Sequence, residues 1–205
     1  PGVTVKSRSG ESRFFIRRRL GGNRGIYGIF RSFGWTREGR LFSFFRDFDR
    51  SFFPMTQTSS FSALGISPEI LEAIEVLGFD TPSSIQEQAI PAAISGADIV
   101  GLSHTGSGKT LAFAIPALEC IEPEERCVQV LALCPTRELA VQICREVDKL
   151  ALFMDGVSAV PIYGGASFRP QLDALRRGVQ FVVGTPGRVM DLRESGALRL
   201  DGLRR

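Results

Sequence analysis

The string Ser-His-Thr-Gly-Ser-Gly-Lys-Thr at residues 103–110 stands between a short apolar run and a helical pattern. Glycines at 106 and 108 would let the backbone turn its N–H groups inward, and a helix starting near Lys109 would add the positive end of its dipole. Such a loop is suited to binding phosphate oxygens. Lys109 would then place a positive charge on the β and γ phosphates, and the Thr110 hydroxyl would be a ligand for Mg²⁺.

This loop departs from the strict phosphate-loop pattern GxxxxGK[ST] at its first position, where Ser103 replaces glycine. Its place between a strand and a helix still favours a phosphate site over an accidental glycine-rich turn. The next residue, His104, is the only histidine of the chain. A single histidine at a variable loop position is more typical of a rim residue than of a general base.

An alternation of strands and helices is predicted around the loop. Apolar runs lie at about residues 98–102, 127–133, 157–162 and 179–184, with helical patterns at 109–120, 136–153 and 168–177 and two earlier helices between Ser67 and Gly78 and after Thr81-Pro82. Because the runs are apolar on both faces, we expect an α/β fold with a parallel sheet and helices on both of its faces. Ligands of such sheets bind at the carboxyl ends of the strands, so the functional residues should follow each strand.

The 205 residues divide into two segments of opposite charge. Residues 1–60 hold 12 Lys+Arg and 4 Asp+Glu, whereas residues 61–205 hold 13 and 18. Ten of the 16 phenylalanines lie within residues 1–54. We therefore predict a basic Phe/Arg/Gly-rich segment at residues 1–54 and one patterned domain at residues 55–205.

Residues 1–54 sustain neither a helical stripe nor a strand alternation, and we assign no fold to them. Three interpretations stay open. The segment is disordered or foreign to the native protein, since the chain starts with proline and Met55 leads directly into the patterned domain. Alternatively, it is an Arg/Gly/Phe tail that binds RNA phosphates and stacks bases, or an Arg- and Ser-rich transit peptide.

Composition excludes several classes of protein. With 43% hydrophobic and 23% charged residues the chain is neither wholly disordered nor fibrous. Four cysteines without a CxxC pair, and a single histidine, leave a zinc site without ligands and favour a reduced, intracellular chain, which we expect in the cytoplasm. The purest apolar stretch, residues 111–118, is far shorter than the roughly 18–20 residues of a membrane-spanning helix.

Five short strings lie at residues 78–86, 103–110, 135–140, 164–165 and 185–188. Their order and spacing are those of the motifs of DEAD-box RNA helicases, and residues 61–205 resemble the first RecA-like domain of that family. Residues 78–86 resemble its Q motif, residues 103–110 its AxTGxGKT loop with Ser103 in place of alanine, residues 135–140 motif Ia, Gly164-Gly165 the GG motif, and residues 185–188 motif Ib. Residues 1–54 match no part of the family. The resemblance implies a superfamily 2 helicase with a RecA-like P-loop domain that binds ATP, Mg²⁺ and a single RNA strand.

The resemblance assigns a set of residues to the nucleotide. They are Phe61, Phe79, Gln86, Thr105, Gly106, Ser107, Gly108, Lys109 and Thr110, of which Lys109 and Thr110 would also serve catalysis and Thr110 would bind the metal. The Gln86 amide offers a donor and an acceptor, which suits the N6 and N7 edge of adenine. Phe61 and Phe79 would pack on the base, with ordinary core packing as the alternative.

A second set is assigned to RNA: Arg137, Gly164, Gly165, Thr185, Gly187 and Arg188. Glycine amides, a hydroxyl and guanidinium groups bind phosphates without reading bases, so we expect binding that is independent of sequence. The alternative for Arg137 is a surface ion pair, and Pro186 would set the turn ahead of a helix. For the remaining basic cluster of Arg169, Arg176 and Arg177 a solvated face is the preferred interpretation.

The family pattern is incomplete. The chain contains neither the Asp-Glu-Ala-Asp string, nor the later SAT motif, nor the second RecA-like domain with its arginine fingers. We therefore expect a partial first domain, incomplete at its C-terminus, that binds nucleotide weakly, hydrolyses none, unfolds with poor cooperativity and associates through unpaired strand edges. The alternatives to a helicase are a non-catalytic RNA- or nucleotide-binding module and a P-loop DNA helicase.

Overall fold

The computed structural model describes residues 3–5, 11–16 and 60–205. All of them belong to one structural unit, and residues 20–57 lie outside the described residues. The three interpretations of residues 1–54 therefore stay predictions. None of the helices in the described part of the chain is long and apolar enough to cross a membrane.

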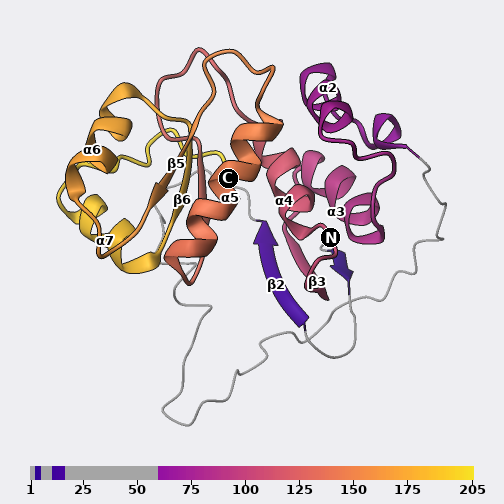
Figure 1. The fold of residues 1–205 in the computed structure, drawn as a ribbon, viewed down its shortest axis with the longest axis horizontal. Coiled ribbons are helices and arrows are strands. Elements are labelled where there is room, and N and C mark those ends of the chain that lie inside the picture. Colours follow the sequence, from indigo (N-terminus) through magenta and orange to yellow (C-terminus); the bar gives the residue numbers. More distant parts are fainter. Residues whose placement is uncertain (1–2, 6–10, 17–59) are drawn as a thin grey trace, which may run out of the picture. The chain divides into compact units, whose positions relative to one another are not determined.

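Helices and strands alternate from residue 61 onward, as predicted (Figure 1). A 3₁₀ helix, η1 (Phe61–Leu64), is followed by α2 (Pro68–Val76), α3 (Ser84–Ile94), β3 (Ile99–His104), α4 (Lys109–Leu118), β4 (Val130–Leu133), α5 (Arg137–Leu150), β5 (Ala159–Ile162), α6 (Phe168–Arg177), β6 (Phe181–Gly184) and α7 (Pro186–Glu194). Each predicted strand and helix after residue 66 is present. The strand predicted at 127–133 is shorter in the structure, where it begins at Val130.

Three of the strands form a parallel sheet in the order β4-β6-β5. Val130 and Ala159 both pair with Phe181, and Leu133 and Ile162 both pair with Gly184. The three strands are therefore in register, and their carboxyl ends lie at one edge of the sheet. This confirms the predicted parallel sheet for three of the four predicted strands, β3 being the exception, and places the segments after these three strands side by side.

Helices cover both faces of this sheet. Successive side chains of β6 pack alternately against the helices of one face and of the other. Phe181 and Val183 pack in one apolar cluster with the buried side of α5. Val182, between them, packs in a second cluster with Leu192 of α7 and Ala174 of α6. Figure 1 shows β5 and β6 between α5 on one side and α6 and α7 on the other. The predicted doubly covered sheet is therefore confirmed.

Strand β3 forms a second sheet with two segments for which no strand was predicted. β1 (Val3–Val5) pairs with β3 in parallel, and β2 (Glu11–Ile16) pairs with it in antiparallel fashion. No fold was assigned to residues 1–54 from the sequence, and these two segments of that range are strands in the structure. Their pairing uses backbone groups along both edges of β3, and such long-range pairing needs no alternation of side chains in the local sequence.

Two buried glutamines hold the loops at the amino end of the parallel sheet. The Gln129 side chain accepts a hydrogen bond from the Glu122 N–H at 2.8 Å and donates to the carbonyl oxygens of Glu122, at 2.8 Å, and of Glu125, at 3.0 Å. The Gln180 side chain donates to the Gly156 carbonyl oxygen at 3.0 Å. Neither glutamine is exposed. Each buried amide therefore finds partners in the loop backbone, as buried polar groups require.

Candidate functional site

The loop between β3 and α4 has the backbone that a phosphate loop requires. Gly106 has φ 81° and Gly108 has φ 82°, a left-handed conformation that glycine adopts without strain. Gly108 is also the N-terminal cap of α4, and the first N–H groups of that helix have no partners within the helix. The predicted turn of the backbone around Gly108 is therefore present.

Lys109 lies over this loop and is hydrogen-bonded to it. Its ammonium donates to the carbonyl oxygen of Ser103 at 3.1 Å, to the hydroxyl of Ser107 at 3.2 Å, and to the His104 carbonyl oxygen. Ser103, the residue that departs from the motif, shares a hydrogen bond with the Ser107 hydroxyl. Burial lowers the pKa of Lys109 below its usual range. The loop thus holds a partly desolvated cation through neutral acceptors, which phosphate oxygens could replace.

Gln86 is bound to the same loop. Only 4% of it is exposed; its amide oxygen accepts from the Ser83 N–H at 2.8 Å, and its amide nitrogen donates to the Gly108 carbonyl oxygen at 3.1 Å. The Ser83 hydroxyl donates to the Ser107 carbonyl oxygen at 2.9 Å. Both halves of the Gln86 amide are therefore engaged by protein, and contact with adenine would require them to exchange partners. That role stays a prediction.

Ser83 was missed as a candidate site residue, although a signal for it exists. Ser83 and Gln86 have the spacing of a capping box, and the structure contains that box at the start of α3. The two residues of this box also bind the carbonyl oxygens of Ser107 and Gly108 in the phosphate loop. The side chains of Ser83 and Gln86 therefore join the start of α3 to the phosphate loop.

The two phenylalanines assigned to the base differ in their surroundings. Phe61 is 4% exposed and packs in the main apolar cluster, as the core-packing alternative expects. Phe79 is 41% exposed, so its ring is available to a ligand. A contact of Phe61 with a base would require the ring to leave the core, and both contacts stay predictions.

The residues predicted to bind RNA meet at the carboxyl edge of the parallel sheet. Arg137 follows β4, Gly164 and Gly165 follow β5, and Thr185 follows β6. The Thr185 N–H donates to the Ile162 carbonyl oxygen at 2.8 Å, which joins the ends of β6 and β5. Segments from three separate parts of the sequence are therefore brought to one edge.

Two of the glycines on this edge have no reason in the fold to be glycine. A Cβ atom added to Gly164 or Gly187 would meet nothing within 4 Å, and neither residue has a positive φ. Gly165 differs, because its φ is 77°. Thr185 is the N-terminal cap residue of α7 but makes no side-chain capping hydrogen bond. Open space beside the backbone, with an uncommitted hydroxyl at the start of a helix, suits the close approach of a ligand.

Arg188 is buried although it carries a charge. It is 7% exposed, and its Nη2 donates to the Ala166 carbonyl oxygen at 3.2 Å, whereas Nε and Nη1 have no hydrogen-bond partner among the described residues. Its Nε lies 3.9 Å from the Asp191 carboxylate, and its guanidinium carbon lies 3.8 Å from the centre of the Phe168 ring. The Arg188 side chain therefore joins α7 to the loop after β5.

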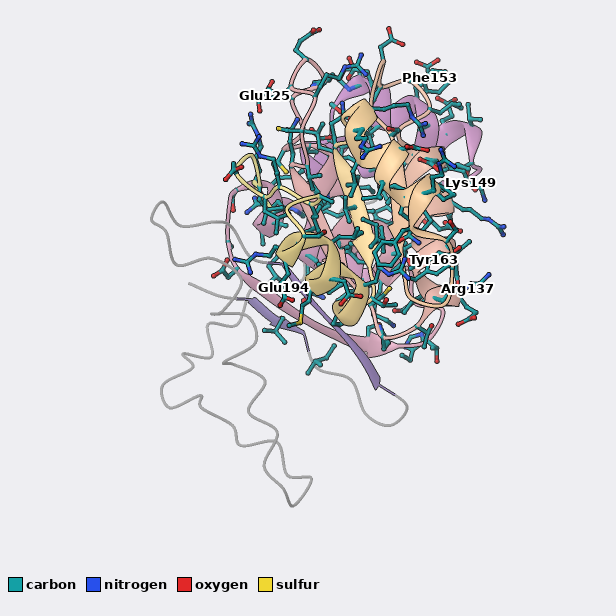
Figure 2. The ribbon with its side chains drawn as sticks, turned by 90° about the vertical axis from the view of Figure 1, so that its left-hand side faces the viewer. Glu125, Arg137, Lys149, Phe153, Tyr163 and Glu194 are labelled. Atoms are coloured by element: carbon teal, nitrogen blue, oxygen red, sulfur yellow. The ribbon has the colours of Figure 1, made fainter. Side chains whose placement is uncertain are left out.

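Arg137 is paired in a similar way with Tyr163. Its guanidinium carbon lies 4.9 Å from the centre of the Tyr163 ring, and Figure 2 shows the two side chains next to each other. No ion pair of Arg137 occurs within the described ranges, so the surface ion-pair alternative is not supported. Tyr163 and Phe168 flank the Gly164-Gly165 turn, and both were missed because an aromatic residue beside a turn has no distinctive sequence signal.

The remaining basic cluster is solvated, as predicted. Arg169, Arg176 and Arg177 are exposed on α6, and Arg176 lies 3.6 Å from the exposed carboxylate of Asp173. Metal-binding clusters of three or more His, Cys, Asp or Glu side chains are absent from the part of the chain that the structure covers.

A family model described as DEAD/DEAH box helicase matches residues 83–204. The chain therefore belongs to the DEAD/DEAH box helicase family. Among curated relatives, the ATP-dependent RNA helicase DeaD of Klebsiella pneumoniae is 48% identical over 145 residues, which cover 71% of this chain and 23% of that protein. The protein of the same name from Mycobacterium tuberculosis is 45% identical over 147 residues, covering 72% and 26%. The chain thus spans about a quarter of the length of these relatives.

Solved structures agree with this assignment. A DEAD box protein from the hyperthermophile Methanococcus jannaschii matches with a TM-score of 0.64 and 36% identity, covering 71% of this chain and 39% of that one. Saccharomyces cerevisiae Dbp5 bound to RNA and ADP BeF3 matches with a TM-score of 0.59 and 29% identity, covering 71% and 36%. The α/β architecture with a RecA-like P-loop domain is therefore that of DEAD-box proteins.

Proposed function

We propose that this chain is part of the ATP-binding first domain of a DEAD-box RNA helicase, which uses ATP to unwind or remodel RNA. The observation that carries the proposal is the loop after β3, in which Lys109 is held over a turn between two left-handed glycines. The DeaD relatives are named ATP-dependent RNA helicases, which favours RNA over DNA as the partner. The cytoplasm stays the predicted location.

The loop residues fit the phosphates of ATP. The N–H groups of Gly106, Ser107 and Gly108 and the start of α4 would surround the phosphate oxygens, with Thr105 at the rim. Lys109 would exchange neutral carbonyl and hydroxyl acceptors for charged oxygens, a stronger hydrogen bond. Bound ATP would supply a phosphoanhydride bond whose hydrolysis drives the conformational cycle of the whole protein.

Thr110 is the residue that would hold Mg²⁺. Its hydroxyl stands at the first turn of α4, beside the expected phosphates. Mg²⁺ commonly keeps several waters and is bound through one or two protein groups together with substrate phosphates, so one hydroxyl ligand from this segment fits the ion. Thr110 and Lys109 are the two groups that this chain would contribute to the reacting phosphate.

The edge formed by Arg137, Gly164, Gly165 and the segment from Thr185 to Arg188 is the proposed RNA face. Guanidinium groups, backbone amides and a hydroxyl bind phosphates and sugars, so contacts through these groups would carry no base code. Dbp5, whose structure with RNA is similar to this one, supports RNA as the ligand class.

Removal of the Lys109 ammonium tests the nucleotide site. Binding of ATP with Mg²⁺ would be measured by calorimetry for the unsubstituted chain, for Lys109→Ala and for Lys149→Ala. Because a hydrogen bond to a charged group contributes about 1.5–3 kcal/mol, we expect Lys109→Ala to weaken ATP binding about ten- to hundredfold. Lys149 is exposed at the far end of α5, so Lys149→Ala should leave the affinity within about twofold. Equal affinities in all three chains would remove the site assignment.

A further inference from the structure

Ser103 is a buried serine at the position where the family motif has alanine. It lies near the end of β3 and is 6% exposed. Its hydroxyl shares a hydrogen bond with the hydroxyl of Ser107, four residues further along the phosphate loop. A buried hydroxyl needs such a partner, because an unpaired one costs free energy. Ser103 and Ser107, the serine pair, therefore give this loop a side-chain bond that an alanine could not form.

Ser107 is the residue through which the side-chain contacts of the loop are connected. Its hydroxyl accepts a hydrogen bond from the Lys109 ammonium at 3.2 Å, and its carbonyl oxygen accepts one from the Ser83 hydroxyl at 2.9 Å. Both of its neighbours in the chain are glycines with a positive φ. Because glycine backbone is conformationally permissive, the bond from Ser103 fixes a residue that the flanking backbone would leave free to move.

The Lys109 ammonium has two acceptors that depend on Ser103. One is the Ser103 carbonyl oxygen, at 3.1 Å, and the other is the Ser107 hydroxyl, whose orientation the serine pair fixes. The carbonyl oxygen of His104 is a third acceptor. An ammonium has three N–H donors, so in this self-bonded conformation the loop itself supplies an acceptor for each of them. Phosphate oxygens must therefore displace loop acceptors before they can bind Lys109.

We propose that Ser103 is a positioning residue which, through Ser107, stabilises the self-bonded conformation of the loop and thereby lowers the affinity of the chain for ATP. The proposal rests on the proposed function and adds to it a residue that sets the strength of nucleotide binding. An apparent affinity is reduced in proportion to the fraction of molecules that are competent to bind. Since a hydrogen bond between neutral groups shifts an equilibrium about two- to tenfold, loss of the serine pair should raise the affinity by that factor.

Removal of the Ser103 hydroxyl tests this proposal. Calorimetry would measure the affinity for ATP with Mg²⁺ of the unsubstituted chain, Ser103→Ala and Ser103→Cys. We expect both substitutions to tighten binding about two- to tenfold, because cysteine is close to serine in volume but is a weak hydrogen-bond donor. Ser95→Ala is the matched control, since it removes a hydroxyl that donates to the Ala92 carbonyl oxygen at the end of α3, and it should leave the affinity unchanged. Unchanged or weaker ATP binding by Ser103→Ala would overturn the proposal.

A double-mutant cycle shows whether Ser103 acts through Ser107. Ser107→Ala removes the second hydroxyl of the serine pair but keeps the N–H that the proposed phosphate contact uses. It should tighten ATP binding by itself, and the addition of Ser103→Ala should then change the affinity no further. Equal gains from Ser103→Ala in both backgrounds would refute the action through Ser107. Because Ser107 is only partly buried, Ser107→Ala keeps the test decisive if Ser103→Ala does not fold.

Binding kinetics distinguish a stabilised loop conformation from a contact with the bound nucleotide. Stopped-flow mixing with an ATP derivative that carries a fluorescent group on its ribose gives the association and dissociation rates. If the loop must leave the self-bonded conformation before binding, Ser103→Ala should raise the association rate about two- to tenfold and leave dissociation unchanged. A change confined to dissociation would contradict the proposal.

Failure of this proposal is distinguishable from failure of the nucleotide site. If Lys109→Ala leaves ATP binding unchanged, the proposed nucleotide site itself is wrong. If Lys109→Ala weakens ATP binding but Ser103→Ala does not strengthen it, the nucleotide site stands and only the role of Ser103 is refuted.

Discussion

Gly108→Ala should damage the phosphate loop more than Gly106→Ala, although both glycines have nearly the same backbone conformation. Their φ angles are 82° and 81°. A Cβ atom on Gly108 would overlap the amide nitrogen of Gln86 and lie 3.3 Å from the Ser83 hydroxyl, whereas a Cβ atom on Gly106 would meet nothing within 4 Å. The two substitutions therefore share the backbone strain and differ in the displacement of Gln86.

The size of each effect can be worked from these contacts. Left-handed backbone costs a non-glycine residue roughly 1–2 kcal/mol, which is the whole effect expected for Gly106→Ala. Gly108→Ala must also displace the buried Gln86 amide from its bonds to the Ser83 N–H and the Gly108 carbonyl oxygen. Loss of such a buried arrangement adds about 1–3 kcal/mol, for a total near 2–5 kcal/mol.

Urea unfolding, followed by circular dichroism, would measure the free energy of unfolding of both variants. Gln86→Ala and the double variant Gln86→Ala with Gly108→Ala complete a double-mutant cycle with Gly108→Ala. With the amide removed, the added cost of Gly108→Ala should fall to that of Gly106→Ala, because the overlapping group is gone. Equal destabilisation by the two alanines, or a Gly108→Ala effect that persists without Gln86, would refute the coupling between the Q motif and the phosphate loop.

Three further predictions concern the parallel sheet and the helices that pack on it. Burial raises the pKa of Cys144 to about 12, so the stability that its protonated thiol contributes should be complete below the unfolded pKa, near about 8.5, and decline as the pH rises toward 12. The free energy of unfolding should therefore decrease more steeply in this range for the unsubstituted chain than for Cys144→Ala, and parallel pH profiles from urea titrations would contradict the assignment. A Cβ on Gly184 would overlap the Val189 side chain, so Gly184→Ala should lower the free energy of unfolding by about 1–3 kcal/mol. Gly187→Ala has open space and should stay within about 0.5 kcal/mol in the same assay while weakening RNA binding in anisotropy titrations, and unchanged RNA affinity would count against the open backbone as a ligand site.

The parts of the fold that local pattern determines were predicted from the sequence. Runs apolar on both faces, such as residues 128–133, indicated strands covered on two sides, and the register of β4, β6 and β5 confirms it. The same register brings the loops at the carboxyl ends of these strands to one edge, where the candidate RNA-binding residues that follow β4, β5 and β6 lie. The sequence also indicated a turn at Gly106 and Gly108, and both glycines have a positive φ in the structure.

The features that the sequence could not indicate depend on contacts between distant residues. Residues 11–16 show no strand alternation, yet they pair with β3 across more than eighty positions of sequence. The motif identifies Arg188 as a cation but not its burial, which depends on the Phe168 ring and the Ala166 carbonyl oxygen from another loop. Gln86 was expected to offer a donor and an acceptor to adenine, and only the fold reveals that both are already engaged.

The buried glutamines at the amino end of the sheet have a consequence for substitutions in the loops that they bind. Gln129 recognises residue 122 through that residue's N–H and carbonyl oxygen alone, as a neighbouring strand would. These two hydrogen bonds do not depend on which side chain stands at position 122. Substitution of Glu122 should therefore preserve these two hydrogen bonds and remove only the ion pair of its carboxylate with Arg204, whereas substitution of Gln129 removes the hydrogen bonds themselves.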